Sequence, residues 1–163
     1  MHLESGMEKS GMPTPRPNTV METMRPVVSL GPTRYIKTKS LRILVVDDEK
    51  AICRFMNRFL SREGQVARTV DNGAEAIHML KSEDFDLVLC DLAMPGVSGW
   101  DIIREIETLD KKPKVGIITA WGPTLNKLKH GDLRVDFVIN KPIELVELTA
   151  RINEVLGAEE RPT

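Results

Sequence analysis

The chain has 163 residues, of which 41% are hydrophobic and 4% aromatic, and its formal net charge is −1. That length accommodates one ordinary domain with an additional segment, and the hydrophobic share is enough for a packed core. The charge gives no reason to expect nucleic acid or a membrane surface as the main partner. No apolar run reaches the roughly 18 residues of a membrane span, and the N-terminus lacks a signal-peptide pattern. We therefore expect a cytoplasmic protein.

Residues 1–40 differ in composition from the rest of the chain. They hold five of the ten prolines and five of the eight methionines, and six Lys/Arg against three Asp/Glu give them a charge of +3. No helical or strand period runs through them, so we predict a mostly disordered extension, which cannot bury enough apolar surface to offset the entropy lost on ordering. Two alternatives stay open: "RPVVSL" and "TRYIKTKS" dock on the domain or on a partner, or translation starts at a later methionine.

From residue 41 onward, short apolar runs alternate with segments of helical period. The runs are typical of strands that are buried on both faces, as in parallel sheets. We predict five strands, at 42–46, 65–70, 86–91, 114–119 and 135–140. Between them, apolar stripes predict helices that contain Ile52, Phe55, Met56, Phe59 and Leu60; Ala74, Ile77 and Leu80; Ile102, Ile103, Ile106 and Leu109; and Leu145, Leu148, Ile152 and Val155.

Several residues are predicted to begin or end these helices. Glu49 opens the first helix, where a negative charge favours the helix dipole, and Gly64 ends it. Ser98 is expected to cap the third helix, and Pro142 opens the last one. The stretch 123–131 predicts only a short or mobile helix because its apolar stripe is thin.

The alternation of strands and helices predicts a doubly wound α/β domain at residues 41–157, followed by a tail at 158–163. In such sheets, ligands bind beyond the carboxyl ends of the strands. The residues at these ends are therefore the first candidates for a functional site.

Three carboxylates, one hydroxyl and one ammonium follow four of the predicted strands. They belong to Asp47, Asp48, Asp91, Thr119 and Lys141. Carboxylates that are crowded together raise each other's pKa unless a cation joins them. Oxygen ligands favour a hard divalent ion, and Mg²⁺ keeps several waters and adds phosphate oxygens. The cluster is thus suited to holding Mg²⁺ beside a phosphoryl group.

Four fragments at these strand ends resemble a known family. "VVDDEK", "DLAMPGVSG", "TA" and "KP", in this order and at these separations, are similar to the receiver domain of two-component response regulators. The resemblance covers about residues 41–157 and is to a stand-alone receiver of the chemotaxis-regulator type. It implies a flavodoxin-like fold with a five-stranded parallel sheet in the order 2-1-3-4-5.

The resemblance also implies a role for each residue of the cluster. Asp91 matches the phospho-accepting aspartate, Thr119 the hydroxyl that bonds a phosphoryl oxygen, and Lys141 the ammonium that contacts the phosphoryl group. The implied ligands of Mg²⁺ or Mn²⁺ are Asp48, Asp91, the backbone carbonyl of Ala93 and, through a water, Asp47.

The chain departs from the family pattern at one switch position. In many receivers, an aromatic residue three positions before the lysine moves inward together with the threonine, and here that position is Val138. The nearest aromatic residue, Phe137, falls on the opposite face of its strand by alternation, so we predict that it belongs to the core.

The cysteines and histidines indicate no further site. Cys53 and Cys90 lie far apart without CxxC spacing and are expected to be reduced, buried thiols. His78 and His130 have no partners at metal-ligand spacing, so no transition-metal site is predicted.

We therefore expect a phosphoacceptor in two-component signalling. A histidine kinase or a histidine phosphotransfer protein would donate the phosphoryl group to Asp91 in a Mg²⁺-dependent step, and the product would alter contacts with a downstream protein. No DNA-binding domain is recognised, so neither nucleic acid nor a membrane is an expected partner. The protein is not expected to be an enzyme, apart from self-phosphorylation from small donors and self-dephosphorylation.

Two other functions stay open. The first is a binding module that keeps the fold but does not cycle phosphate. The second is a phosphohydrolase with an aspartate nucleophile, although "VVDDE" has Glu49 two residues after Asp47, where such enzymes carry a second aspartate.

Overall fold

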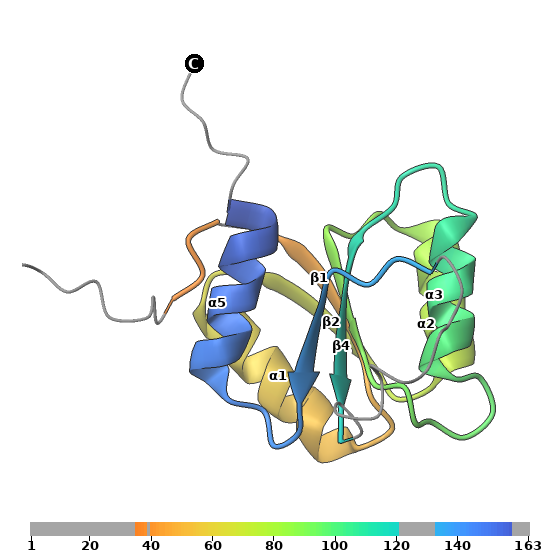
Figure 1. Ribbon diagram of the computed structural model, residues 1–163, viewed down its shortest axis with the longest axis horizontal. Helices are drawn as coiled ribbons and strands as arrows, with labels where there is room; N and C mark the ends of the chain where they lie inside the picture. The colour runs from red at the N-terminus through yellow and green to blue at the C-terminus, as the bar shows by residue number, and fades with distance from the viewer. Residues whose placement is uncertain (1–34, 39, 121–132, 158–163) are drawn as a thin grey trace, which may run out of the picture. The chain divides into compact units, whose positions relative to one another are not determined.

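The computed structural model describes residues 35–38, 40–120 and 133–157. All of these residues belong to one compact unit, Pro32–Thr163. Within it, five parallel strands form one sheet in the order β2-β1-β3-β4-β5, with helices on both faces (Figure 1). The predicted doubly wound α/β fold and its strand order are confirmed.

Strands and helices alternate along the described chain. The strands are β1 (Arg42–Val46), β2 (Val66–Val70), β3 (Leu87–Cys90), β4 (Lys114–Thr119) and β5 (Phe137–Asn140). The helices are α1 (Lys50–Arg62), α2 (Gly73–Ser82), α3 (Gly99–Glu107) and α5 (Leu145–Leu156). Every predicted strand is present, and the helix predicted at 123–131 lies outside the described residues.

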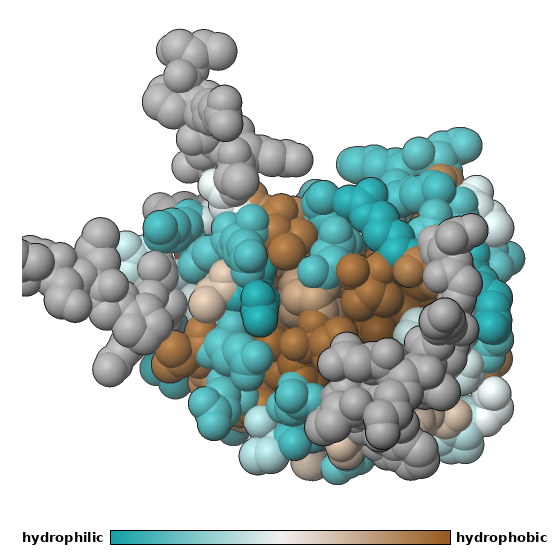
Figure 2. Space-filling model, viewed as in Figure 1, coloured by the Kyte–Doolittle hydropathy of each residue, from teal (hydrophilic) through white to brown (hydrophobic). Residues whose placement is uncertain are grey.

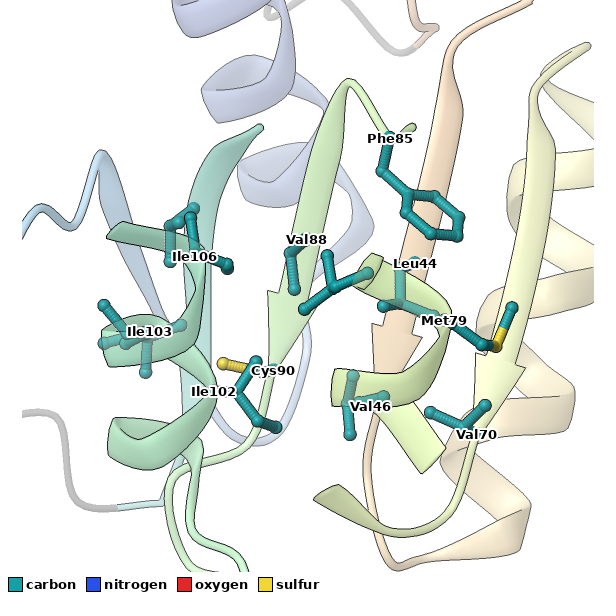
Figure 3. Packing of buried hydrophobic residues seen from close by; sticks show 14 of the residues in the cluster. Leu44, Val46, Val70, Met79, Phe85, Val88, Cys90, Ile102, Ile103 and Ile106 are labelled. Carbon is teal, nitrogen blue, oxygen red and sulfur yellow. The ribbon is translucent and has the colours of Figure 1, made fainter. Parts of the chain in front are cut away.

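The sheet is apolar on both faces because helices cover both. α1 and α5 lie on one face, and α2 and α3 lie on the other (Figure 1). Since successive strand residues point to opposite faces, Leu44 joins the cluster beneath α2 and α3, whereas Val45 joins the cluster beneath α1 and α5. Figure 3 shows the first cluster, in which Met79 of α2 and Ile102 and Ile106 of α3 pack with strand residues.

The same alternation separates two neighbouring residues of β5. Phe137 is buried beneath α1 and α5, where its ring lies against Gly116, while Val138 is half-buried against the cluster beneath α2 and α3. The prediction that Phe137 belongs to the core is confirmed. The switch position of the family is therefore aliphatic in this fold.

Figure 2 shows hydrophobic side chains at the surface over β4 and β5, between α5 and α3. These are the two strands that residues 121–132 connect along the chain, and that segment lies outside the described residues. Leu133, Val135 and Val138, which precede or belong to β5, are half-buried and pack against the cluster beneath α2 and α3.

Two helix starts show how the sequence specifies the local structure. Ser98 caps α3 as predicted: its Oγ accepts from the Asp101 N–H at 3.3 Å, and the Asp101 carboxylate accepts from the Ser98 N–H at 2.9 Å. The Ser98 hydroxyl also donates to the Asp101 carboxylate at 2.8 Å, and this bond together with the one from the Ser98 N–H lowers the pKa of Asp101 below its ordinary value. Glu49 occupies the N-cap position of α1, but its side chain makes no capping hydrogen bond.

Both cysteines are free and buried, as predicted. Within residues 35–38, 40–120 and 133–157, no helix is long and apolar enough to cross a membrane.

Residues 35–38, which the sequence analysis placed in the extension, lie against the C-terminal turns of α5. We call them the N-terminal strap. Asn153 of α5 holds the strap with both ends of its amide: Nδ2 donates to the Tyr35 carbonyl at 2.9 Å, and Oδ1 accepts from the Lys37 N–H at 2.8 Å. Between these bonds, the Ile36 side chain is 5% exposed and packs in the cluster beneath α1 and α5. These contacts agree with the docking alternative for this part of "TRYIKTKS".

Removal of the Ile36 side chain tests whether the strap is part of the cooperative fold. Ile36→Ala is expected to lower the free energy of unfolding by about 2 kcal/mol, because it deletes buried methyl groups and leaves a cavity. Tyr35→Ala is the control, since Tyr35 is 61% exposed, and it should change stability by less than about 0.5 kcal/mol. The measurement is urea unfolding followed by circular dichroism, and equal stability of Ile36→Ala and the wild type would contradict this role of the strap.

Candidate functional site

The site lies at the carboxyl ends of four strands, where hydrogen bonds between neighbouring strands fix the position of each residue along the strand direction. Asp47 follows β1, Asp91 follows β3, Thr119 ends β4 and Lys141 follows β5. The Asp91 N–H donates to the Val46 carbonyl at 2.9 Å, and the Lys141 N–H donates to the Thr119 carbonyl at 2.9 Å. Because parallel strands end at one edge of the sheet, these pairings bring residues distant in sequence to the same place.

The Lys141 ammonium is the centre of the site. Its Nζ lies 2.9 Å from Asp47 Oδ2, 2.9 Å from Asp91 Oδ2 and 3.1 Å from Glu49 Oε1. The side chain of Lys141 is only 14% exposed. Burial alone would lower the pKa of Lys141, but the attraction of the three carboxylates that surround its ammonium outweighs burial and raises the pKa above its ordinary value. Lys141 is therefore held as a cation among acids.

Asp47 is the most deeply buried carboxylate of the cluster, at 2% exposure. Burial raises the pKa of Asp47, although the Lys141 ammonium and the Glu49 N–H both act in the opposite direction. Oδ1 accepts a hydrogen bond from the Glu49 N–H at 2.9 Å. Oδ2 faces Lys141 as an ion pair but has no hydrogen-bond partner of good geometry, so this buried oxygen has unused capacity for a ligand.

Three carboxylates meet at the open side of this cluster. Asp47, Asp48 and Asp91 each offer one oxygen, and these oxygens lie within 4.8 Å of one another. Asp48 is exposed, whereas Asp47 and Asp91 are buried, so the group opens to solvent on one side. An all-oxygen set of this kind, with a buried oxygen that lacks a hydrogen bond, fits a hard divalent cation.

Ala93 and Thr119 complete the set of predicted residues. Ala93 lies beside Asp91, because its N–H donates to Asp91 Oδ1 at 3.1 Å. Thr119 is fully buried at the last position of β4 and lies opposite Asn140 in the ladder, one residue before Lys141. The structure thus brings all the predicted residues to one edge of the sheet, while the ligand role of the Ala93 carbonyl and the role of the Thr119 hydroxyl stay predictions.

Glu49 is the residue whose role the sequence analysis missed. It was expected only to open α1 through its charge, yet its carboxylate contacts Lys141 across 92 residues of sequence. The motif "VVDDEK" contained it, but no local pattern indicates that its side chain turns toward a lysine on another strand.

Two buried thiols lie next to the carboxylates. The Cys53 Sγ donates to the Asp47 carbonyl at 3.1 Å, and Cys90 directly precedes Asp91. Burial raises the pKa of Cys53, and it raises that of Cys90 to about 12. Both side chains are therefore protonated packing residues, not nucleophiles.

The loop after Asp91 is held close to the site by a glycine at the start of α3. A Cβ added at Gly99 would overlap the Asp91 carbonyl oxygen and lie 2.9 Å from Leu92 Cα. These neighbours are backbone atoms, which cannot move without shifting Asp91 itself. The Gly99 N–H also donates to the Leu92 carbonyl at 3.3 Å, which closes the loop.

Comparison with known proteins gives a consistent set of relatives. A family described as the response regulator receiver domain matches residues 43–153. The transcriptional regulatory protein CusR of Escherichia coli K12 is 32% identical over 116 residues, which cover 71% of this chain and 51% of CusR. ResD of Bacillus subtilis is 34% identical over 120 residues, 74% of this chain and 50% of ResD. The chain thus spans about half the length of the curated relatives it matches.

Solved structures agree with the sequence matches. The response regulator TrrA of Thermotoga maritima, solved in complex with Mg(2+)-BeF, is 34% identical with a TM-score of 0.64, over 73% of this chain and 100% of that one. The receiver domain of the sensor histidine kinase PA1611 of Pseudomonas aeruginosa is 20% identical, with a TM-score of 0.64 over 72% of this chain and 98% of that one. At this identity, the similarity supports the fold alone.

A methyl group at position 99 tests how tightly the loop is packed. Gly99→Ala is expected to lower the free energy of unfolding by about 1–3 kcal/mol, because the overlap with backbone outweighs the gain in helix propensity. Gly157→Ala is the control: nothing lies closer than 3.8 Å to the added Cβ, so its stability should be unchanged or raised by up to about 1 kcal/mol. Urea unfolding of both variants provides the comparison, and a Gly99→Ala protein as stable as the wild type would refute the close packing.

Proposed function

The chain belongs to the response regulator receiver domain family, and we propose that it is a phosphoacceptor of two-component signalling that uses Asp91. The observation that carries this proposal is the contact of the buried Asp91 carboxylate with Lys141, beside two further carboxylates at the same strand edge. A strand-end aspartate with a fixed cation on one side and a metal-type ligand set on the other is arranged for phosphoryl transfer.

The proposed donor is a phosphohistidine of a kinase or of a phosphotransfer protein. In the transfer, an oxygen of Asp91 forms a bond to phosphorus while the bond from phosphorus to the donor nitrogen breaks, and the departing imidazole keeps that electron pair and takes up a proton. Phosphoryl transfer depends mainly on positioning and charge neutralisation. Lys141 is placed to neutralise the new charge, and Thr119 is proposed to donate a hydrogen bond to a phosphoryl oxygen.

The proposed cofactor is Mg²⁺, for which Mn²⁺ is a substitute. Asp48, Asp91 and the Ala93 carbonyl would hold the ion, with Asp47 acting through a water. When bound, such an ion supplies positive charge to the phosphoryl oxygens. The support from this chain is its cluster of oxygen donors, together with the Asp47 oxygen that lacks a hydrogen bond.

The output of the protein is proposed to be a changed contact with a protein partner. An added phosphoryl group carries about two negative charges and would draw Lys141 away from its present carboxylates. CusR and ResD are named as transcriptional regulatory proteins, and the matched region covers about half of each. For this chain, we propose that the response passes to another protein and not to nucleic acid, and that the protein is cytoplasmic. A role as a turnover enzyme is not proposed.

Replacement of the acceptor tests the central proposal. Acetyl phosphate with Mg²⁺ is expected to add one phosphoryl group to the wild type, as read by intact mass and by mapping of the labelled peptide, and Asp91→Asn should abolish the label because the amide is not a nucleophile. Asp71→Asn is the control, since Asp71 also follows a strand but lies outside the carboxylate cluster. Labelling of Asp91→Asn at the wild-type level would rule out Asp91 as the acceptor, and steady turnover of diverse phosphate esters would favour the phosphohydrolase.

Metal binding is tested without phosphate. Mg²⁺ at ten times its dissociation constant is expected to raise the free energy of unfolding by about 1.4 kcal/mol, because it binds only the folded carboxylate cluster. Asp48→Asn should remove most of this stabilisation, whereas Asp71→Asn should retain it. Thermal unfolding with and without Mg²⁺ measures both, and an Asp48→Asn protein that responds like the wild type would contradict the proposed ligand set.

A further inference from the structure

The N-terminal strap, residues 35–38, ties together the C-terminal ends of two helices. At the end of α1, the Glu63 carboxylate accepts a hydrogen bond from the Ile36 N–H at 2.9 Å. At the end of α5, the Asn153 amide makes its two hydrogen bonds to the strap backbone, and the carbonyl of the last helical residue accepts from the Thr38 hydroxyl at 3.4 Å. The buried Ile36 side chain packs in the cluster beneath both helices. The fit of the strap therefore depends on how α1 and α5 lie relative to each other.

The same two helices are connected at their other ends, beside the candidate site. α1 begins after Glu49, whose carboxylate lies 3.1 Å from Lys141 Nζ, and Lys141 lies in the turn that leads into α5. Both helices run from the carboxyl ends of the strands to the end of the domain at which the strap lies (Figure 1). A change in the contact between Glu49 and Lys141 therefore acts on a pair of helices that the strap joins at the opposite end.

A strained residue connects the strap to β1. Among the described residues other than glycine, Ser40 alone has a positive φ, of 60°. Its N–H donates to the Gly64 carbonyl at 3.2 Å, which fixes the turn. This left-handed conformation is unfavourable for a residue with a Cβ, and the Ser40 side chain is exposed, so its packing does not offset the cost. Release of the strap would let Ser40 return to an extended conformation.

The contacts of the strap can open without disruption of the sheet. The described hydrogen bonds of residues 35–38 go to side chains and to the last carbonyl of α5, not to a strand. Ile36 enters the core, whereas the neighbouring Tyr35 side chain is exposed. Segments of this kind open locally while the rest of a domain stays folded. The strap thus has two accessible states, docked and released.

We infer that the strap is a latch coupled to the acceptor site: it is docked while Lys141 pairs with Glu49, and it is released more readily when a phosphoryl group on Asp91 draws Lys141 away. This inference rests on the proposed function, since it describes the regulation of the same site. Both the site and the strap bias one equilibrium, between docked and released states. By linkage, release of the strap must favour phosphoryl binding by the same factor by which phosphoryl binding favours release.

The first test follows the Ile36 N–H of the full chain by hydrogen exchange in NMR spectra, with beryllofluoride and Mg²⁺ as a mimic of the phosphoryl group. Saturation with this mimic is expected to speed exchange of the Ile36 N–H about fivefold, because exchange requires release of the strap and coupling energies of this size are common. Unchanged or slower exchange would overturn the inference, since the strap would then not be released by the site.

The second test measures the reciprocal effect. Ile36→Asp is expected to keep the strap released, because docking would bury a carboxylate beside that of Glu63. It should lower the dissociation constant of beryllofluoride, measured in Mg²⁺, by about fivefold, the factor found by exchange. Tyr35→Asp is the matched control: it adds the same charge at the adjacent exposed side chain and should stay within about twofold of the wild type. Equal dissociation constants of Ile36→Asp and the wild type, or an equal decrease in Tyr35→Asp, would overturn the inference.

Two substitutions at the exposed Ser40 shift the latch without a change in the core, and they carry the test if Ile36→Asp does not fold. Ser40→Val is expected to speed exchange of the Ile36 N–H about tenfold, because a β-branched residue is strongly disfavoured at positive φ. Ser40→Asn should slow it about twofold, since asparagine tolerates this conformation better than serine. Equal exchange in the two variants would contradict a latch held across a strained turn.

Failure of the proposed function is a different result. It would appear as a wild-type chain that binds no beryllofluoride, or that binds it equally well after Asp91→Asn, and the inference would fall with it. Failure of the latch alone leaves binding that depends on Asp91 intact in the wild type and in every strap variant, with the same dissociation constant throughout.

Discussion

The architecture of the site depends on one ammonium shared among carboxylates. Asp47 and Asp91 are buried and carry like charges, and each lies 2.9 Å from Lys141. Without that cation, burial would raise the pKa of Asp47 further, and the two like charges would repel each other without compensation. Because Lys141 follows β5 while the acids follow β1 and β3, the arrangement exists only when the parallel sheet is correctly assembled. The sheet, in turn, needs apolar strands covered on both faces, which the helices provide.

The sequence predicts the site well for a topological reason. Strand ends can be located from apolar runs, and in a parallel sheet all of them reach one edge, so Asp47, Asp91 and Lys141 could be placed together without any knowledge of side-chain conformation. The position of Glu49 could be predicted in the same way, but the direction of its side chain could not, since that depends on Lys141. The N-terminal strap is harder still, because Tyr35 and Asn153 are 118 residues apart and neither belongs to a periodic pattern.

Close contacts with two helices hold the loop after Asp91 in place. Gly99 packs on the Asp91 carbonyl, and Gly73 at the start of α2 packs in the same way on Val97 of that loop. The loop is thus held from two helices, and a displacement of Asp91 would have to move both contacts. On the proposed function, the response to phosphate is then carried by Thr119 and Lys141, since the half-buried Val138 offers no aromatic ring to move with them.

The two sides of α1 differ in what they contribute to the fold. Its inner side supplies Met56 and Leu60 to the core, and its first turn begins at Glu49, which contacts Lys141. Its outer side has an exposed phenylalanine among arginines without partners in the described structure. Neither feature stabilises the chain, because exposed apolar area and like-charge spacing both oppose folding and solubility.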